Sequence, residues 1–239
     1  MSLLSPLLDL QDLDLARDRL GVERAALPER AAILASRATA EQLDADHGVM
    51  VEQCRALSAS EHELGDEVSA VAARAKDVEA TLYSGTVRAS KELTALQEEI
   101  RLHGVRQSEL EGRELELLEE IDRVDRTMAE NRAAHTRTCA ELAHLTDALT
   151  LAEQAIDAEL AKLDLARQGL LGSIPAEIVV TYERLRTRER LVGRAATSLV
   201  EGGCGGCRMK LPVLEYNRMK QKPEDALLLC VHCGRILVR

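Results

Sequence analysis

The sequence predicts a mainly α-helical fold: a long antiparallel coiled-coil hairpin, a short bracing helix, and a small C-terminal β domain built around four cysteines. Three observations carry this prediction. Apolar residues recur with a heptad period over most of residues 1–172. The chain has no Phe or Trp and only 3 Tyr, although aromatic residues supply much of the buried area of compact cores. Two CxxC pairs stand close together near the C-terminus.

The two arms of the hairpin, which together occupy residues 1–172, follow from the spacing of apolar residues. The first arm begins with leucines seven residues apart, at Leu13, Leu20, Leu27 and Leu34. This series resumes at Leu43 after a step of nine, and its 4-3 alternation is complete over residues 64–82. The second arm steps 4-3 from Leu117 to Ile156, but three of its seam positions are polar: Asn131, His135 and Thr138. A 3.5-residue apolar period of this length specifies helices that supercoil around each other.

The turn of the hairpin is predicted near residues 84–90, in the segment LYSGTVRASKEL. Gly85 tolerates the left-handed conformation that ends helices. Ser90 suits the N-cap of the next helix, and Glu92 lies in its first turn. A turn centred here makes facing residues of the two arms sum to about 173, so that residues 130–139 face residues 34–43.

The stretch at residues 173–192 predicts a bracing helix and a linker. Pro175 stands near the helix N-terminus, where its missing N–H costs nothing. Ile178, Tyr182 and Leu185 share one face of this helix, and arginines spread around its other faces. These arginines suit either a solvated surface or contact with phosphate.

Residues 193–239 predict a zinc ribbon. Cys204 and Cys207 form one CxxC pair, Cys230 and Cys233 form the other, and 22 residues separate the pairs. Zn²⁺ prefers four tetrahedral ligands, and each CxxC turn supplies two sulfurs, so we expect one structural Zn²⁺. Short strands are expected at residues 194–201, 226–230 and 235–239, and a helix or ordered loop at 211–221.

Charge is unevenly distributed along the chain. The whole chain carries a net charge of −10, but residues 182–239, here called the basic head, contain twelve Lys/Arg and six Asp/Glu and therefore carry +6. A basic surface of this kind attracts nucleic acid, DNA or RNA, mainly through phosphate. The candidate contacts are Arg184, Arg186, Arg188, Arg208, Lys210, Arg218, Lys220, Lys222 and Arg235.

The sequence favours a binding protein over an enzyme. Four cysteine ligands leave zinc no open position for catalysis, and no Gly-rich phosphate loop or small-molecule substrate site is recognisable. The alternative to nucleic-acid binding is a protein–protein adaptor that uses the coiled coil and its exposed turn, with candidate contacts at Tyr83, Ser84, Gly85, Lys91 and Glu92. No apolar stretch is long enough to span a membrane, and no signal peptide is recognisable, which predicts a cytoplasmic protein without a membrane partner.

The chain also resembles a known family, the bacterial proteins with an N-terminal coiled-coil hairpin and a C-terminal C4-type zinc ribbon, once grouped only as a domain of unknown function. Three segments carry the resemblance: LYSGTVRASKELTALQEEI, IPAEIVVTYERLR and GGCGGCRMKLP…CVHCGRIL. Ala89-Ser90 stands where Asn-Pro is usual in the family. The resemblance implies a non-enzymatic role and partners among nucleic acids, sigma factors, or export and flagellar components.

Overall fold

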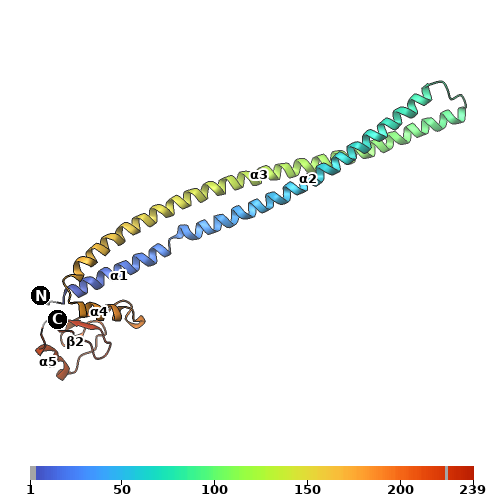
Figure 1. Ribbon diagram of the computed structural model, residues 1–239. Coiled ribbons are helices and arrows are strands. Elements are labelled where there is room, and N and C mark those ends of the chain that lie inside the picture. The colour runs from blue at the N-terminus through green and yellow to red at the C-terminus, as the bar shows by residue number, and fades with distance from the viewer. Residues whose placement is uncertain (1–3, 224–225) are drawn as a thin grey trace. The chain divides into compact units, whose positions relative to one another are not determined.

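The structure is a computed structural model that describes residues 4–223 and 226–239. Its helices are α1 (Pro6–Ala25), α2 (Pro28–Tyr83), α3 (Ser90–Leu171), α4 (Ala176–Arg186) and α5 (Val213–Gln221), with a short 3-10 helix, η1 (Glu189–Leu191). Figure 1 shows that α2 and α3 are long helices joined by a turn, and that the strands are confined to the C-terminal part. The predicted fold class is confirmed.

The chain divides into two compact units. Unit 1 contains residues Met1–Ala31 and Thr146–Arg239, and unit 2 contains Ala32–Leu145. Helices α2 and α3 each contribute to both units. The division of the chain at residues 172 and 192, inferred from the sequence, stays a prediction.

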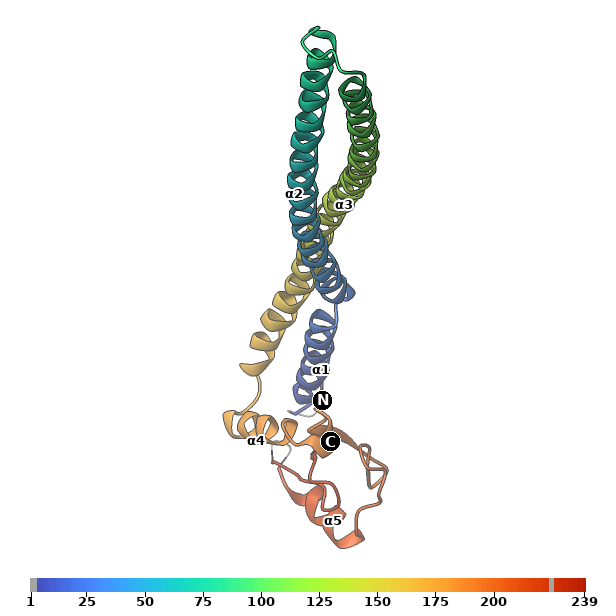
Figure 2. The same ribbon diagram turned by 90° about the vertical axis from the view of Figure 1, so that its right-hand side faces the viewer.

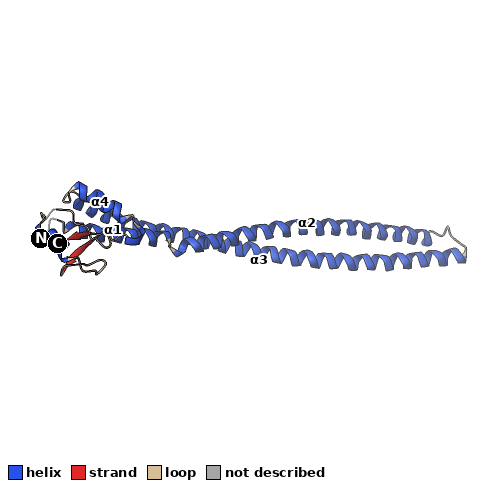
Figure 3. Ribbon diagram, turned by 90° about the horizontal axis from the view of Figure 1, so that it is seen from below, coloured by secondary structure: helices blue, strands red, loops and turns tan. Residues whose placement is uncertain are grey.

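Unit 2 is the antiparallel coiled coil, and its register differs from the predicted one. The Sγ of Cys54 lies 3.6 Å from Asp125 Oδ1, and His135 Nε2 lies 3.2 Å from Asp44 Oδ1. The numbers of both pairs sum to 179, so the predicted sum of about 173 is wrong here. The cause is an asymmetric turn: Figure 3 shows α3 beginning beyond the end of α2, so the first residues of α3 have no partner on α2. The polar seam at His135 therefore faces Asp44 rather than a residue near 38.

The turn itself follows the sequence in one respect and departs from it in another. Gly85 adopts the left-handed conformation, with a φ of 73°. Ser90, however, is the first residue of α3, and the carbonyl of Ala89 accepts the N–H groups of Glu92 and Leu93. Ala89 thus occupies the N-cap position, and the expectation that Ser90 caps the helix is wrong. On the other side of the turn, Ser84 Oγ accepts the N–H of Thr86 at 3.3 Å.

The first arm is interrupted where the sequence predicted a continuous heptad series. Helix α1 ends at Ala25 and α2 begins at Pro28. Because proline lacks an N–H and disfavours the helical conformation of the residue before it, Leu27 lies outside both helices. Ion pairs from Arg24 and Arg30 to α3 lie on either side of this break.

Unit 1 has a core that α1, α4 and a small sheet share. Leu7 and Leu10 of α1 are buried with Ile178 and Tyr182 of α4 and with Ile236 of the sheet. The predicted apolar face of the bracing helix is therefore confirmed, since Leu185 is buried beside these residues as well. Figure 2 shows α4 and the strands next to the N-terminal end of α1.

The sheet has three strands in the order β2-β1-β3. Strand β1 (Ala196–Val200) pairs with β2 (Gly203–Cys204) in antiparallel fashion and with β3 (Ile236–Val238) in parallel. The strand expected at residues 226–230 does not form in the described part of that segment, where Leu229 makes only an isolated bridge to Ile236. The helix expected at 211–221 is confirmed as α5.

A buried polar network joins α1 to the other elements of unit 1. The Asp14 side chain is 0% exposed. Its Oδ2 accepts the Tyr182 hydroxyl at 2.8 Å, and its Oδ1 accepts Arg167 Nε at 2.8 Å. One turn earlier, Gln11 Oε1 accepts the backbone N–H of Ala196 at 2.8 Å. Helix α1 is thereby bonded to α3, α4 and strand β1.

Candidate metal centre and nucleic-acid interface

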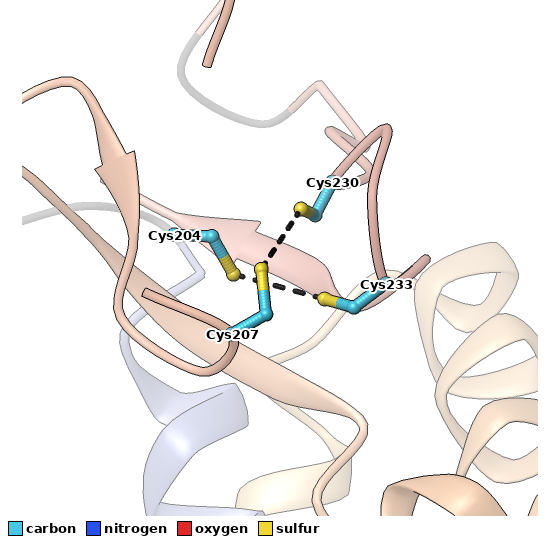
Figure 4. A group of neighbouring side chains, drawn as sticks. All are labelled: Cys204, Cys207, Cys230 and Cys233. Atoms are coloured by element: carbon cyan, nitrogen blue, oxygen red, sulfur yellow. Dashed lines mark hydrogen bonds between the residues drawn. The ribbon is translucent and has the colours of Figure 1, made fainter. Parts of the chain in front are cut away.

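The four cysteines converge on one point in unit 1. Their sulfur atoms all lie within 4.8 Å of one another. Figure 4 shows the side chains of the two pairs pointing toward each other. The Sγ atoms of Cys204 and Cys233 are 3.8 Å apart, as are those of Cys207 and Cys230. Four sulfurs at about 2.3 Å from one tetrahedral zinc would be about 3.8 Å apart, so this arrangement fits Zn²⁺.

The two CxxC turns, here called the first knuckle (residues 204–208) and the second knuckle (residues 230–234), have the same backbone pattern. Arg208 N–H donates to the Cys204 carbonyl at 2.8 Å, and Gly234 N–H donates to the Cys230 carbonyl at 2.8 Å. Arg208 and Gly234 both have a positive φ, of 60° and 75°. Each turn thus directs two sulfurs to the same side, as a C4 site requires.

The surroundings of the sulfurs favour the thiol at Cys204 and the thiolate at Cys233. Burial raises the pKa of the Cys204 thiol to about 12. Burial also opposes ionisation of Cys233, but the Arg235 N–H and the neighbouring cysteines outweigh it and lower the pKa of Cys233 to about 7. Zinc binds thiolates, so loading the site releases protons and contributes folding free energy to this small sheet. The donor set and its spacing support one structural zinc.

The basic residues predicted to contact nucleic acid fall into two groups in the structure. Four of them have partners within the chain. Arg186 forms ion pairs with Asp18 at 2.5 Å and with Asp14 at 3.7 Å. Arg218 pairs with Glu215 at 3.2 Å, and Lys220 Nζ lies 4.5 Å from the centre of the Tyr216 ring.

Arg235, the fourth, supports the metal centre. Its Nε donates to the Arg194 carbonyl at 2.8 Å, and its side chain is among the groups that lower the pKa of Cys233. The other five side chains are exposed and form no ion pair with any residue in 4–223 or 226–239: Arg184, Arg188, Arg208, Lys210 and Lys222. The structure thus leaves five basic side chains of the head without a carboxylate partner among the described residues.

The residues predicted to form a partner contact at the hairpin turn are all exposed in unit 2. The Tyr83 side chain is the most prominent of them, at 78% exposed. The others are Ser84, Gly85, Lys91 and Glu92. Tyr83, Ser84 and Gly85 lie at the end of α2 or in the turn. Lys91 and Glu92 lie in the first turn of α3.

Two features of unit 1 were not predicted from the sequence. Arg194 was not proposed as a contact, yet it lines the same cleft as Arg208 and Arg235. The Asp14 network was also missed, because Asp14 lies 153 residues from Arg167 and 168 from Tyr182. Within the described residues, no helix is long and apolar enough to cross a membrane.

Comparison with known proteins covers both parts of the chain. Residues 10–190 match the CT398-like coiled coil hairpin domain, and residues 204–237 match the C4-type zinc ribbon domain. The protein Rv2229c of Mycobacterium tuberculosis H37Rv, described as uncharacterized, is 31% identical over 247 residues. The matched region covers 98% of this chain and 94% of that relative.

Solved structures show the same fold. A structure from Mycobacterium smegmatis matches with a TM-score of 0.75 at 22% identity, over 100% of both chains. The structure of CT398 from Chlamydia trachomatis matches with a TM-score of 0.66 at 18% identity, over 99% of this chain and 97% of that one. The chain belongs to the family of the CT398-like coiled-coil hairpin domain and carries a C4-type zinc ribbon.

Proposed function

We propose that this chain is a non-enzymatic zinc-ribbon protein that binds nucleic acid through its basic head. One observation carries the proposal. Five exposed basic side chains of the head have no acidic partner among the described residues, so their charge is available to phosphate. Arg186 is left out of the proposed surface because Asp14, Asp18 and Glu183 surround its guanidinium.

The contact is expected to be electrostatic rather than based on stacking. Tyr182 is 0% exposed and donates to Asp14, so its ring is not available to a base. Tyr216 is half-buried and has Lys220 over its ring. Stacking of bases on aromatic rings supplies the part of single-strand affinity that does not depend on salt. The head has almost no exposed aromatic ring for such stacking. Binding should therefore be weakly sequence-specific and strongly salt-sensitive.

The test is fluorescence anisotropy of short labelled RNA and DNA strands, titrated with the zinc-loaded full chain at several salt concentrations. Each neutralised phosphate releases counterions, so log affinity should fall linearly with log salt. Replacing Lys210 and Lys222 with alanine should weaken binding about equally for unrelated sequences and flatten that line by about one to two units of slope.

The matched control replaces Lys76 and Lys91, two exposed lysines of unit 2, with alanine. It makes the same change in net charge outside the head and should leave affinity nearly unchanged. A truncation before Tyr182 is a poorer control, because it removes the second half of α4 and the sheet from the core that covers Leu7 and Leu10. No binding by the full chain at low salt, or equal losses in both double variants, would contradict the proposal.

A second candidate function, that of a protein adaptor, is favoured by one specific observation. Tyr83 exposes 78% of its surface at the end of α2, where nothing in the described structure covers it. Exposed tyrosines are common anchors in protein interfaces. A pull-down from lysate with and without nuclease separates the two functions: partners that survive nuclease and are lost in Tyr83→Ala support the adaptor. Either function suits a cytoplasmic location, where thiols stay reduced and bind zinc.

A further inference from the structure

We propose that a phosphate of the nucleic-acid backbone binds in a single cleft of unit 1, here called the arginine cleft, which Arg194, Arg208 and Arg235 line beside the first knuckle. This inference rests on the proposed function and names the part of the head that carries it. The arginine cleft has a volume of about 410 Å³ and lies between α1, strand β1 and residues 205–208. It includes Arg194, which the pattern of the sequence did not single out.

The three arginines reach the cleft from separate segments. Arg194 precedes strand β1, Arg208 closes the first knuckle, and Arg235 precedes strand β3. None of the three forms an ion pair with a carboxylate in the part of the chain that the structure describes. Guanidinium groups bind phosphate oxygens in bidentate fashion, so arginines that line one cleft without a carboxylate partner suit a phosphate.

A comparison of the two knuckles indicates that the backbone conformation of the turn does not require an arginine at position 208. Arg208 and Gly234 occupy the same position and adopt the same left-handed conformation, with φ values of 60° and 75°. Glycine adopts this conformation without steric cost, whereas a residue with a Cβ is strained in it. The second knuckle uses the unstrained residue, and the first knuckle uses an arginine that lines the cleft. Strain of this kind at a ligand site is an observation that points toward function.

The glycines of the first knuckle keep the floor of the cleft free of side chains. A Cβ on Gly206 would lie 2.8 Å from Arg235 Cδ, so any larger residue there would force the Arg235 side chain to move. A Cβ on Gly205 would lie 2.9 Å from the Ser198 carbonyl. Arg235 is further fixed by its bond to the Arg194 carbonyl at 2.8 Å, which couples two of the three arginines.

Helix α1 supplies the opposite wall of the cleft, with one residue that can bind an anion and one that repels it. Gln11 lines the cleft with its oxygen bonded to Ala196 N–H, which leaves its NH2 group to donate to an anion. Asp12 is exposed on the same wall and carries the only negative charge among the described residues that line the cleft. A phosphate in the cleft is repelled by Asp12, so removing this charge should strengthen binding.

The experiment compares four variants of the zinc-loaded full chain in the same anisotropy titration. Arg208→Gly and Arg194→Ala should each weaken binding at least about fivefold and lower the salt slope by about one. Asp12→Asn should tighten binding by about two- to threefold, since it removes one repulsive charge. The matched control, Arg88→Ala, removes an exposed arginine of unit 2, outside the head, and should change affinity less than about twofold.

Arg208→Gly carries a second readout that separates lost contact from lost structure. Because glycine relieves the left-handed strain, this variant should retain its zinc and melt at the same temperature as the parent chain or higher. Weaker binding by an equally or more stable protein supports a direct role for Arg208. A lower melting temperature together with lost zinc would overturn the argument from the two knuckles.

The remaining outcomes distinguish this inference from the function on which it rests. If the parent chain binds and the two cleft variants behave like Arg88→Ala, the arginine cleft is wrong and nucleic-acid binding stands. If the parent chain does not bind at low salt, both fail. If inorganic phosphate or pyrophosphate binds in the cleft while oligonucleotides do not, the cleft holds a free anion and the nucleic-acid assignment is overturned.

Discussion

Replacing Tyr182 with phenylalanine removes the hydroxyl that donates to the buried carboxylate of Asp14. The hydrogen bond is 2.8 Å long, and both side chains are 0% exposed. The substitution leaves the ring and its packing against the core of unit 1 in place. Asp14 Oδ2 then loses its donor, while Oδ1 keeps Arg167 Nε at 2.8 Å.

The magnitude follows from the kind of bond that is lost. A hydrogen bond to a charged group contributes about 1.5 to 3 kcal/mol, and water cannot easily reach a fully buried carboxylate to replace it. Arg167 and, at 3.7 Å, Arg186 still offset the charge, so the carboxylate is not left unpaired. We expect Tyr182→Phe to lower the free energy of opening of unit 1 by about 2 kcal/mol.

The assay is hydrogen exchange of peptides from α4, which reports opening of unit 1 separately from the coiled coil of unit 2. Tyr216→Phe is the matched control, because the Tyr216 hydroxyl has no hydrogen bond in the described residues and its loss should change stability by less than about 0.5 kcal/mol. Equal exchange in the two variants would refute the claim that the Asp14 network holds α1 and α4 together.

The pH dependence gives an independent check on the same bond. Burial, together with the hydrogen bond to Asp14, raises the pKa of Tyr182 above its ordinary value of 10.0. Above that pH the unfolded chain loses the phenolic proton while the folded chain keeps it, so stability falls by about 1.4 kcal/mol per pH unit for this group. The contribution is fully present below about pH 10. The gap between the parent chain and Tyr182→Phe in urea unfolding should therefore shrink above pH 10, and a constant gap would contradict the assignment.

Two further predictions concern the metal and the coiled coil. Cys204→Ser removes one zinc ligand, so elemental analysis should show less than one zinc per chain. Hydrogen exchange should show loss of protection in the sheet, while helicity at 222 nm is largely kept. A full zinc content with an ordered sheet would contradict this prediction. Leu64 and Leu117 line one groove of the coiled coil, whereas a symmetric turn would place Leu64 opposite Glu109. In a variant without Cys54 and Cys139, a short bismaleimide should therefore crosslink cysteines at positions 64 and 117 in preference to cysteines at positions 64 and 109. The opposite preference would restore the symmetric register.

Local patterns in the sequence predicted the elements well. The heptad series identified two facing helices because a 3.5-residue period has few other physical meanings. Ile178, Tyr182 and Leu185 were assigned to one buried face because three apolar residues at helical spacing need a common neighbour. The zinc site followed from spacing alone, since two CxxC pairs supply a complete tetrahedral set.

The register and the break of the coiled coil were less predictable. The loop between Tyr83 and Ser90 does not bisect the hairpin, because seam packing along the whole length fixes the register and not the midpoint of the turn. The interruption near Leu27 had a signal in Pro28, which favours the first position of a helix over its interior. The leucine spacing masked this signal because a break of two residues preserves the heptad count.

The contacts that matter most for function depend on tertiary structure. Asp14 lies among alternating leucines and acidic residues that resemble an ordinary solvated face, and its hydrogen-bond partners are more than 150 residues away. Arg194, Arg208 and Arg235 converge only because β1 pairs with β3 and the two knuckles share one metal site. No local pattern in the sequence predicts that these three residues meet. The sequence does show that an arginine follows Cys207 where a glycine follows Cys233, and the structure shows that both residues are left-handed.

Ultraviolet crosslinking of the zinc-loaded full chain to a bound oligonucleotide, followed by mass spectrometry of the crosslinked peptides, shows directly whether the basic head contacts nucleic acid. We expect crosslinked peptides from residues 194–239 and from the part of α1 that carries Gln11, with crosslinking suppressed by salt. Crosslinks that map mainly to unit 2, or a head that remains unmodified while the chain binds, would contradict it.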